Sequence, residues 1–349
     1  MVKELLQLDP KLKVEKAFDD STLLIDSELE REDFTRRIMH QSPIFIKHLM
    51  PVMSAGTITE DLINDRNEIL SNMQDLVPLK ERIPFAVQCR VISGGENGLT
   101  YSSKDVEVYI GEYYEALGNV PKFSDTSLVN EDIQIMSVFI NKKDYYLGFS
   151  TSRENLNFHC NEYRIFSKGS GREISRAENK LKEALSKFAI QLSGEGFALD
   201  IGAAPGGWTK VLADHGYNVI AVDPGDLKPE LQNHPRIKHY KCRIEALEFD
   251  NFFDIIVNDM NVDPQITAQI MNSLTPTLKE KGLAVVTLKL PDKVEEDIMS
   301  AVNILSEYYH VLTVKSLFHN RQEVTALIQK KTLIKEQGAT RKRINPNEK

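Results

Sequence analysis

Short apolar runs that each end in an ionisable residue recur through the second half of the chain. Runs of this length are typical of buried parallel strands. They cover residues 198–201, 218–222, 254–258 and 283–288, and a further strand is expected at 324–329. Because parallel strands end at one edge of a sheet, the ionisable residues should gather where such sheets bind ligands. The pattern predicts an open α/β sheet.

A glycine-rich turn follows the first strand, in the sequence Ala198-Leu-Asp-Ile-Gly-Ala-Ala-Pro-Gly-Gly-Trp208, and leads into a predicted helix at residues 209–215. Glycines let the backbone approach a ligand closely. The turn lacks the G-x-G-x-x-G spacing of dinucleotide-binding folds, and Pro205 has no N–H to offer a pyrophosphate. Asp223 follows Asp200 at about the twenty-residue spacing at which an acid meets ribose hydroxyls. The turn therefore indicates a site for a neutral or cationic nucleoside.

The first half of the chain mixes helical and strand periods. Residues 34–40, 58–70 and 103–117 have the pattern of helices, whereas residues 85–91, 133–140 and 145–149 have that of strands. The chain is expected to have five parts: an N-terminal α+β region (1–75), a second α+β domain (76–155), a linker (156–172), the α/β domain (173–335) and a basic tail (336–349).

The α/β domain opens with a predicted helix. Ser175-Arg-Ala-Glu178 has the form of a capping box, with Ser175 as the N-cap. A single apolar stripe follows at Ala177, Leu181, Ala184, Leu185 and Phe188. At 100° per residue, Lys180 lies about 60° from the centre of that stripe. We therefore expect the Lys180 side chain to be partly covered by its own helix.

Lys180, Asp259, Lys289 and Glu323 are the candidate catalytic residues. Two lysines and two carboxylates that face one cleft suit the removal of a proton from a ribose hydroxyl. A lysine does this when its ammonium pKa is lowered, which burial and a second ammonium bring about. The carboxylates would orient the lysines. The cationic nucleoside that the turn indicates could be a sulfonium that donates a methyl group to this hydroxyl. Such a donor carries its own positive charge, so no metal is expected.

Other methyl acceptors fit the sequence less well. Methylation of a base amino group usually involves an Asn/Asp-Pro-Pro-aromatic string, whereas this chain has Asn258-Asp-Met-Asn-Val-Asp-Pro264. Methylation of a pyrimidine carbon uses a cysteine nucleophile, and Cys242 has no Pro-Cys or Thr-Cys setting. A hydroxyl acceptor therefore fits best.

These motifs resemble the FtsJ/RrmJ family of S-adenosylmethionine-dependent RNA 2′-O-ribose methyltransferases, over about residues 174–331. The segment from Ser175 to Lys180 is similar to the family's leading helix, and the glycine-rich turn is similar to its donor-binding loop. Three further strings match the family's acid, central lysine and final glutamate: Asn258-Asp-Met260, Leu288-Lys-Leu-Pro291 and Leu317-Phe-His-Asn-Arg-Gln-Glu-Val-Thr325. The resemblance implies a Rossmann-like methyltransferase sheet and S-adenosylmethionine as cofactor.

The resemblance also assigns roles to individual residues. It implies that Lys289 is the general base and that Lys180, Asp259 and Glu323 complete the catalytic set. The residues implied in donor binding are Ser175, Asp200, Gly202, Ala204, Pro205, Gly206, Gly207, Trp208, Asp223 and Asp259. The chain departs from the family where an acid contacts adenine, because Arg243 stands near that position. Glu245 is the candidate substitute.

The N-terminal extension is similar to that of family members with a THUMP RNA-binding domain, which methylate a cytidine of 23S ribosomal RNA. Residues 84–150 resemble a THUMP pattern. The implied partner is structured RNA, either 23S ribosomal RNA or a pre-ribosomal particle. Two alternatives stay open. One is a non-catalytic RNA-binding or ribosome-assembly factor that keeps the fold, and the other is a nicotinamide dehydrogenase, which the glycine turn disfavours.

Charge and composition add to this picture. The chain of 349 residues has a net charge of −8, which argues against a protein that binds nucleic acid over most of its surface. Residues 164–187 nevertheless hold seven basic against three acidic residues, and residues 330–349 hold seven against two; such segments suffice for phosphate contacts. No stretch is long enough to span a bilayer, and the N-terminus does not have the form of a signal peptide. Cys89, Cys160 and Cys242 lie far apart, without a metal-binding spacing, so we expect a cytoplasmic protein without a membrane partner.

Overall fold

The computed structural model describes residues 2–76, 79–81, 83–92, 99–118, 133–156, 174–175, 177–250, 252–290 and 294–332. The chain forms two compact units. The first is Met1–Gln191 with Lys315–Val324, and the second is Leu192–Val314 with Thr325–Lys349. The expected linker, from residue 157 on, and the expected basic tail at 336–349 lie outside the described residues. The five-part division of the sequence stays a prediction.

A small α+β layer begins the first unit. Two helices, α1 (Val2–Leu8) and α2 (Arg31–Gln41), accompany the antiparallel strands β1 (Lys13–Asp19) and β2 (Thr22–Asp26). Their apolar side chains share a core made of Leu5, Leu8, Leu12, Phe34, Ile38 and Ile46. The N-terminal region therefore has a hydrophobic core of its own.

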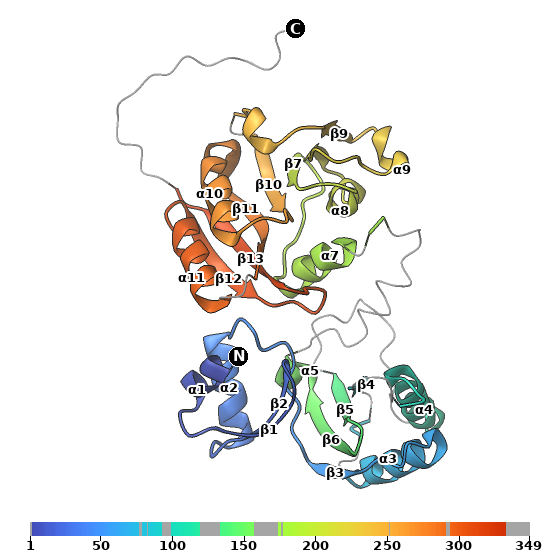
Figure 1. Ribbon diagram of the computed structural model, residues 1–349. Helices are drawn as coiled ribbons and strands as arrows, with labels where there is room; N and C mark the ends of the chain where they lie inside the picture. Colours follow the sequence, from blue (N-terminus) through green and yellow to red (C-terminus); the bar gives the residue numbers. More distant parts are fainter. Residues whose placement is uncertain are drawn as a thin grey trace. The chain divides into compact units, whose positions relative to one another are not determined.

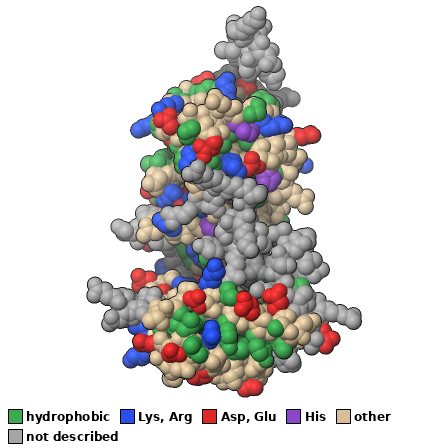
Figure 2. Space-filling view, turned by 90° about the vertical axis from the view of Figure 1, so that its right-hand side faces the viewer, with side chains coloured by type: hydrophobic (Ala, Val, Ile, Leu, Met, Phe, Trp, Pro, Cys, Tyr) green, Lys and Arg blue, Asp and Glu red, His purple; other side chains and the backbone are tan. Residues whose placement is uncertain are grey.

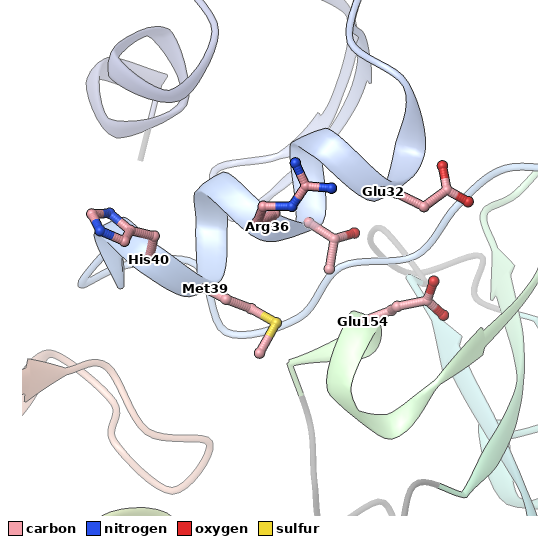
Figure 3. Close-up of a pocket in the computed structure, with 6 residues that line it drawn as sticks. Glu32, Arg36, Met39, His40 and Glu154 are labelled. Carbon is pink, nitrogen blue, oxygen red and sulfur yellow. The ribbon is translucent and has the colours of Figure 1, made fainter.

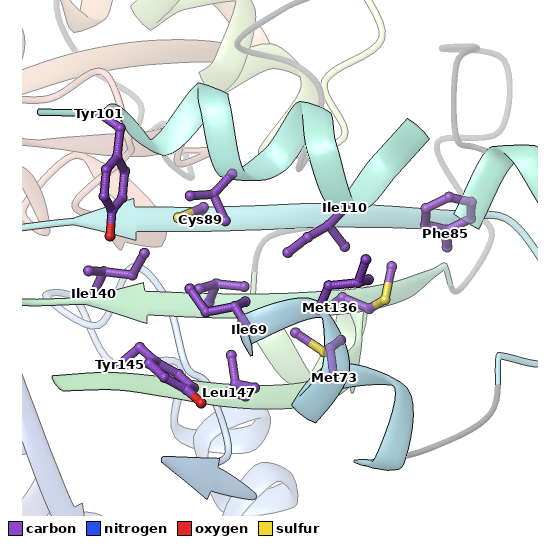
Figure 4. Packing of buried hydrophobic residues seen from close by; sticks show 13 residues of the cluster. Ile69, Met73, Phe85, Cys89, Tyr101, Ile110, Met136, Ile140, Tyr145 and Leu147 are labelled. Atoms are coloured by element: carbon purple, nitrogen blue, oxygen red, sulfur yellow. The ribbon is translucent and has the colours of Figure 1, made fainter. Parts of the chain in front are cut away.

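The first unit also contains a four-stranded sheet in the order β3-β6-β5-β4. Its strands are β3 (Ser54–Thr57), β4 (Phe85–Val91), β5 (Gln134–Ile140) and β6 (Asp144–Thr151). β4 and β5 are parallel, and the other pairs are antiparallel. The helices α3 (Leu62–Leu76) and α4 (Ser103–Ala116) pack on one face, where strand and helix side chains interdigitate (Figure 4). Two short elements, α5 (Ser152–Asn155) and α7 (Ala177–Lys187), complete the described helices of this unit.

A seven-stranded sheet forms the centre of the second unit, in the order β12-β13-β11-β10-β7-β8-β9 (Figure 1). Its strands are β7 (Phe197–Ile201), β8 (Asn218–Val222), β9 (Ile237–Tyr240), β10 (Phe253–Asn258), β11 (Leu278–Lys289), β12 (Tyr309–Lys315) and β13 (Glu323–Lys330). The five strands from β9 to β11 pair in parallel. From that edge the order is 3-2-1-4-5 in chain sequence, as in doubly wound sheets, and β13 lies between β11 and β12. The expected α/β, Rossmann-like sheet is confirmed.

Helices connect these strands. They are α8 (Gly207–Asp214), α9 (Pro229–Gln232), α10 (Pro264–Ser273) and α11 (Val294–Leu305), with the 3₁₀ turns η2 (Ile244–Ala246) and η3 (Thr275–Thr277). α10 and α11 lie side by side (Figure 1), and the Asn272 amide of α10 donates to the Ile304 carbonyl of α11 at 2.7 Å. None of the described helices has the length and apolar composition needed to cross a membrane.

Most elements expected from the sequence are confirmed. β9 and β12 were not expected from the sequence. They are the edge strands of the sheet and are only partly buried, so neither contains a long apolar run. The prediction of a capping box at Ser175 is wrong. The Glu178 carboxylate instead accepts the N–H of Ile174, and α7 begins at Ala177, two residues after Ser175. The hydroxyl of Ser175 has no hydrogen-bond partner among the described residues.

Candidate active site

The glycine turn lies at the edge of the sheet where the parallel strands end. The N–H of Gly202 donates to the carbonyl of Val222 at the end of β8 (3.0 Å). The N–H of Asp259, just after β10, donates to the carbonyl of Ile201 at the end of β7 (3.1 Å). The strand order reverses between β7 and β10, and α/β sheets bind their ligands at this point, outside the carboxyl ends of the strands.

The backbone at Gly202 leaves no room for a side chain. Its φ is +76°, in the left-handed region that favours glycine. A Cβ at this position would lie 2.9 Å from the backbone nitrogen of Met260, which follows β10. The turn after β7 and the chain after β10 therefore approach each other closely because residue 202 is a glycine.

We expect Gly202→Ala to lower the free energy of unfolding by about 2–3 kcal/mol and to weaken methyl-donor binding, because both backbone strain and a clash arise. Gly118→Ala is the matched control. Gly118 has a similar φ of +72°, but a Cβ there would have no described atom within 4 Å. It should lose about 1 kcal/mol and keep its donor affinity. Urea unfolding and calorimetric titration with S-adenosylhomocysteine measure the two effects, and equal losses in the two variants would contradict the close approach at Gly202.

Asp200 is buried beneath the turn. Its Oδ2 accepts a hydrogen bond from the Thr209 hydroxyl (2.5 Å), whereas Oδ1 has no partner among the described residues. Burial raises the pKa of the carboxyl to about 7; the Thr209 hydrogen bond opposes this rise, and the charges of Asp259 and Asp223 add to it. Two further carboxylates, Asp223 and Asp259, therefore lie close enough to act on Asp200, and a cluster of carboxylates favours a cationic ligand.

The raised pKa predicts how stability depends on pH. An aspartate titrates near 3.8 when exposed, so between about pH 4 and pH 7 the folded state binds more protons than the unfolded state. Stability from this group should fall as pH rises through that window, at up to about 1.4 kcal/mol per pH unit. Asp200→Asn should remove the effect, so the variant gains stability relative to wild type at pH 8 but not at pH 4. Urea unfolding followed by fluorescence of Trp208, the single tryptophan of the chain, measures this. A difference between the two proteins that stays constant with pH would contradict it.

Asp223 follows β8, and its carboxylate is fixed beside the glycine turn. It accepts the N–H of Ala204 at 3.2 Å and that of Gly225 at 2.6 Å. These bonds place the acid that the sequence predicts to meet a ribose next to the predicted donor-binding loop. Both carboxylate oxygens retain lone pairs for further donors.

Lys289 is the last residue of β11, and it pairs with Asp259 after the neighbouring strand β10. The Lys289 Nζ lies 3.4 Å from the Asp259 Oδ1, and the two side chains are 21% and 13% exposed. The Thr287 hydroxyl donates to the same carboxylate oxygen at 2.8 Å. Asp259 is thus held between two side chains of β11, and it orients the lysine at the carboxyl edge of the sheet.

Lys180 and Glu323 form a second pair in the first unit. The Lys180 Nζ on α7 lies 3.0 Å from the Glu323 Oε1, and the side chains are only 14% and 7% exposed. The Asn320 amide also donates to this carboxylate, at 3.4 Å. The Lys180 side chain is mostly covered, as expected, while its cover by its own helix stays a prediction. Each predicted lysine is paired with one predicted carboxylate, and the common cleft for the two pairs stays a prediction.

Three residues near these pairs are not among those predicted from the sequence: Thr287, which donates to Asp259, Asn320, which donates to Glu323, and Glu183, which accepts the N–H groups of Phe318 and His319. Thr287 stands two positions before Lys289, the spacing that puts two side chains on one face of a strand. Glu183 stands three positions after Lys180, the spacing of neighbours on a helix. Asn320 lies three residues before Glu323. Their spacing to the predicted residues is visible in the sequence, but their contacts depend on elements that are distant in sequence.

The remaining predicted donor residues lie on the turn and at the start of α8. Pro205 is exposed, whereas Gly206, Gly207 and Trp208 are buried. Arg243 precedes the 3₁₀ turn η2, and Glu245 within that turn is exposed to solvent. The contacts of these residues with a donor stay predictions.

A separate open hollow of about 490 Å³ lies along α2 in the first unit (Figure 3). Its lining is made of Glu32, Thr35, Arg36, Met39, His40 and Glu154. Arg36 is paired with Asp33 at 2.8 Å, and Glu154 is paired with Arg31 at 2.8 Å. None of the predicted site residues lines this hollow, so it is distinct from the candidate active site.

The segment that carries these residues matches a known family. The family described as FtsJ-like methyltransferase matches residues 174–307. This match covers less than half of the chain. The family resemblance of the sequence motifs is confirmed.

Similar proteins include two curated relatives of this domain. An uncharacterized protein of Methanocaldococcus jannaschii is 31% identical over 169 residues, which are 46% of this chain and 47% of that protein. The ribosomal RNA large subunit methyltransferase M of Aliivibrio salmonicida is 30% identical over 223 residues, which are 58% of this chain and 60% of that protein. The chain thus spans about half the length of the curated relatives it matches. Among solved structures, TrmN from Thermus thermophilus aligns over 94% of this chain and 95% of its own, with 13% identity and a TM-score of 0.36.

Proposed function

We propose that this protein transfers a methyl group from S-adenosylmethionine to a ribose 2′-hydroxyl of structured RNA, with large-subunit ribosomal RNA as the substrate. The observation that carries the proposal is the Lys289–Asp259 pair, 3.4 Å apart, at the end of β11 and β10. This pair lies at the same edge of the sheet as the glycine turn, because Asp259 is hydrogen-bonded to the end of β7. A lysine held beside a nucleoside-binding turn suits the removal of a proton from a sugar hydroxyl.

The residues at the turn fit S-adenosylmethionine. The Asp200 Oδ1 is buried without a partner among the described residues, and such a group is destabilising unless a ligand or water pairs with it. Asp223 would hold the ribose of the donor, and the turn from Gly202 to Gly207 would lie against it. When bound, the cofactor supplies an electrophilic methyl group on a positively charged sulfur. The cluster of carboxylates around the turn suits that charge.

The catalytic work of the chain itself would be divided among four residues. Lys289 would take the proton from the 2′-oxygen as that oxygen attacks, acting as general base. Asp259 would orient Lys289. Lys180 would bring a second positive charge to the developing negative charge on the oxygen, oriented by Glu323.

The first unit would hold the RNA. We propose that the four-stranded sheet with α3 and α4 is a THUMP-like RNA-binding domain, in accord with the sequence resemblance. On the face that Figure 2 shows, acidic, basic and hydrophobic side chains of the described residues are interspersed. We propose that local basic segments of the sequence, such as residues 164–187, supply contacts to phosphates. We propose a cytoplasmic protein that acts on free ribosomal RNA or on a pre-ribosomal particle.

The test is methyl transfer with the purified full chain. Tritiated S-adenosylmethionine and an in-vitro transcribed, hence unmodified, large-subunit ribosomal RNA should yield labelled RNA. Nuclease digestion and mass spectrometry should then place the methyl group on a ribose. Methylation of a base would overturn the assignment of the acceptor. RNA binding without any transfer would favour a non-catalytic assembly factor, and stabilisation by NAD but not by S-adenosylhomocysteine would favour a dehydrogenase.

A further inference from the structure

Phe318 is the most exposed large hydrophobic side chain in the described part of the chain, at 61%. Its neighbours in sequence are not exposed: Leu317 is 2% and Asn320 is 4% exposed. Large aromatic side chains are usually buried. The Phe318 ring meets the His319 ring edge-on, with ring centroids 5.3 Å apart, yet most of the side chain faces solvent. The exposure of Phe318 is therefore a specific feature of a turn that is otherwise well packed.

The turn that carries Phe318 is held rigidly by Glu183 of α7. The Glu183 carboxylate accepts the backbone N–H of Phe318 at 2.6 Å and that of His319 at 2.9 Å. The His319 Nδ1 lies 2.7 Å from the same carboxylate. In addition, the Asn320 side chain accepts the N–H of Leu317 at 2.8 Å, which closes the turn. An aromatic ring on a fixed backbone loses little conformational entropy when a ligand packs on it.

The same turn is tied to the Lys180–Glu323 pair. Asn320 donates to the Glu323 carboxylate, and Lys180 pairs with it. Glu183, which holds Phe318, stands one helical turn after Lys180 on α7. Short hydrogen-bond links therefore connect the exposed ring to one of the two proposed catalytic pairs.

Nucleobases are the ligands that match such a ring. Proteins that recognise RNA stack unpaired bases on exposed aromatic side chains, and an enzyme that acts on one nucleotide of a folded RNA must take it out of its stack. We propose that Phe318 is a stacking platform for a base of the substrate RNA, at or next to the nucleotide whose ribose is methylated. This inference rests on the proposed function.

The test compares Phe318→Ala with Phe318→Trp on the in-vitro transcribed large-subunit ribosomal RNA. Phe318→Ala should raise KM for the RNA on the order of 10-fold, as loss of one base–aromatic stack does, with kcat changed less than KM. Phe318→Trp should restore KM to near wild type, because it keeps an aromatic face. Its new indole should also be quenched by the RNA, above the small response of the buried Trp208. All variants should show the same thermal shift with S-adenosylhomocysteine, which reports an intact donor site.

Leu312→Ala is the matched control, because Leu312 on β12 is also large, hydrophobic and exposed, at 51%. It should keep KM within about twofold of wild type. A wild-type KM for Phe318→Ala, or an unquenched Phe318→Trp, overturns the inference while methyl transfer by the wild type upholds the proposed function. Quenching of Phe318→Trp by an RNA that the wild type does not methylate upholds the stacking contact and overturns the proposed function instead.

Discussion

Lys289→Ala is expected to lower kcat for methyl transfer by about 10³-fold, because it removes the proposed general base. The affinity for S-adenosylhomocysteine should stay within about twofold of wild type, since we propose that the glycine turn and Asp223, rather than the lysine, hold the donor. The variant Lys289→Arg tests whether residue 289 acts as a base or only supplies a positive charge. An arginine keeps the positive charge and can pair with Asp259, but it does not give up a proton at accessible pH. It should therefore be as inactive as the alanine variant.

The control for this prediction lies on the same strand. Lys279 stands at the other end of β11, where its Nζ lies 2.8 Å from the Asp254 Oδ1, and its side chain is 45% exposed. Lys279→Ala removes a lysine–carboxylate pair of the same two neighbouring strands, away from the carboxyl edge. It should keep kcat within about twofold of wild type. Single-turnover methyl transfer measures all three variants, and an active Lys289→Arg enzyme would rule out the general-base role.

Glu323→Ala should have the second largest effect, because it acts on stability as well as on rate. It removes the carboxylate paired with Lys180 where both side chains are almost covered, at 7% and 14% exposure. Breaking such a pair from one side leaves a poorly solvated charge, and we expect a loss of about 3 kcal/mol in the free energy of unfolding. Methyl transfer should fall as well, because Lys180 loses its orientation. Urea unfolding and transfer kinetics measure the two losses separately.

A double variant distinguishes a structural pair from a catalytic one. Lys180→Met/Glu323→Leu replaces both charges by apolar groups of similar size, which is often neutral or stabilising. It should regain most of the lost stability and remain inactive. Recovery of wild-type kcat in this variant would show that the pair serves the fold alone. Glu28→Ala is the control for ion-pair loss as such, because the Lys11–Glu28 pair is 72% and 62% exposed and should contribute less than about 1 kcal/mol.

Several parts of the site could be predicted from the sequence because their signals are local. The glycine-rich turn after Asp200 is recognisable from consecutive residues. The positions of the acids and the lysine at the strand ends follow directly from the short apolar runs. The helix that carries Lys180 has a clear apolar stripe, and the position of Lys180 beside that stripe follows from helix geometry. The capping box at Ser175 is also a local pattern, yet that prediction is wrong, because the Glu178 carboxylate accepts the N–H of Ile174 instead.

The sequence alone therefore determined which residue types stand at the ends of the strands and around the glycine turn, since these depend on chain periodicity and turn chemistry. Only the tertiary structure decided which lysine pairs with which carboxylate, because Asp259 and Lys289 lie thirty residues apart and meet through the register of β10 and β11. It also decided the raised pKa of Asp200, which depends on burial and on acids from other strands. The hydrogen bond from the Phe318 N–H to the Glu183 carboxylate joins residues 135 positions apart. Contacts of this kind arise when distant segments pack together, and no local pattern encodes them.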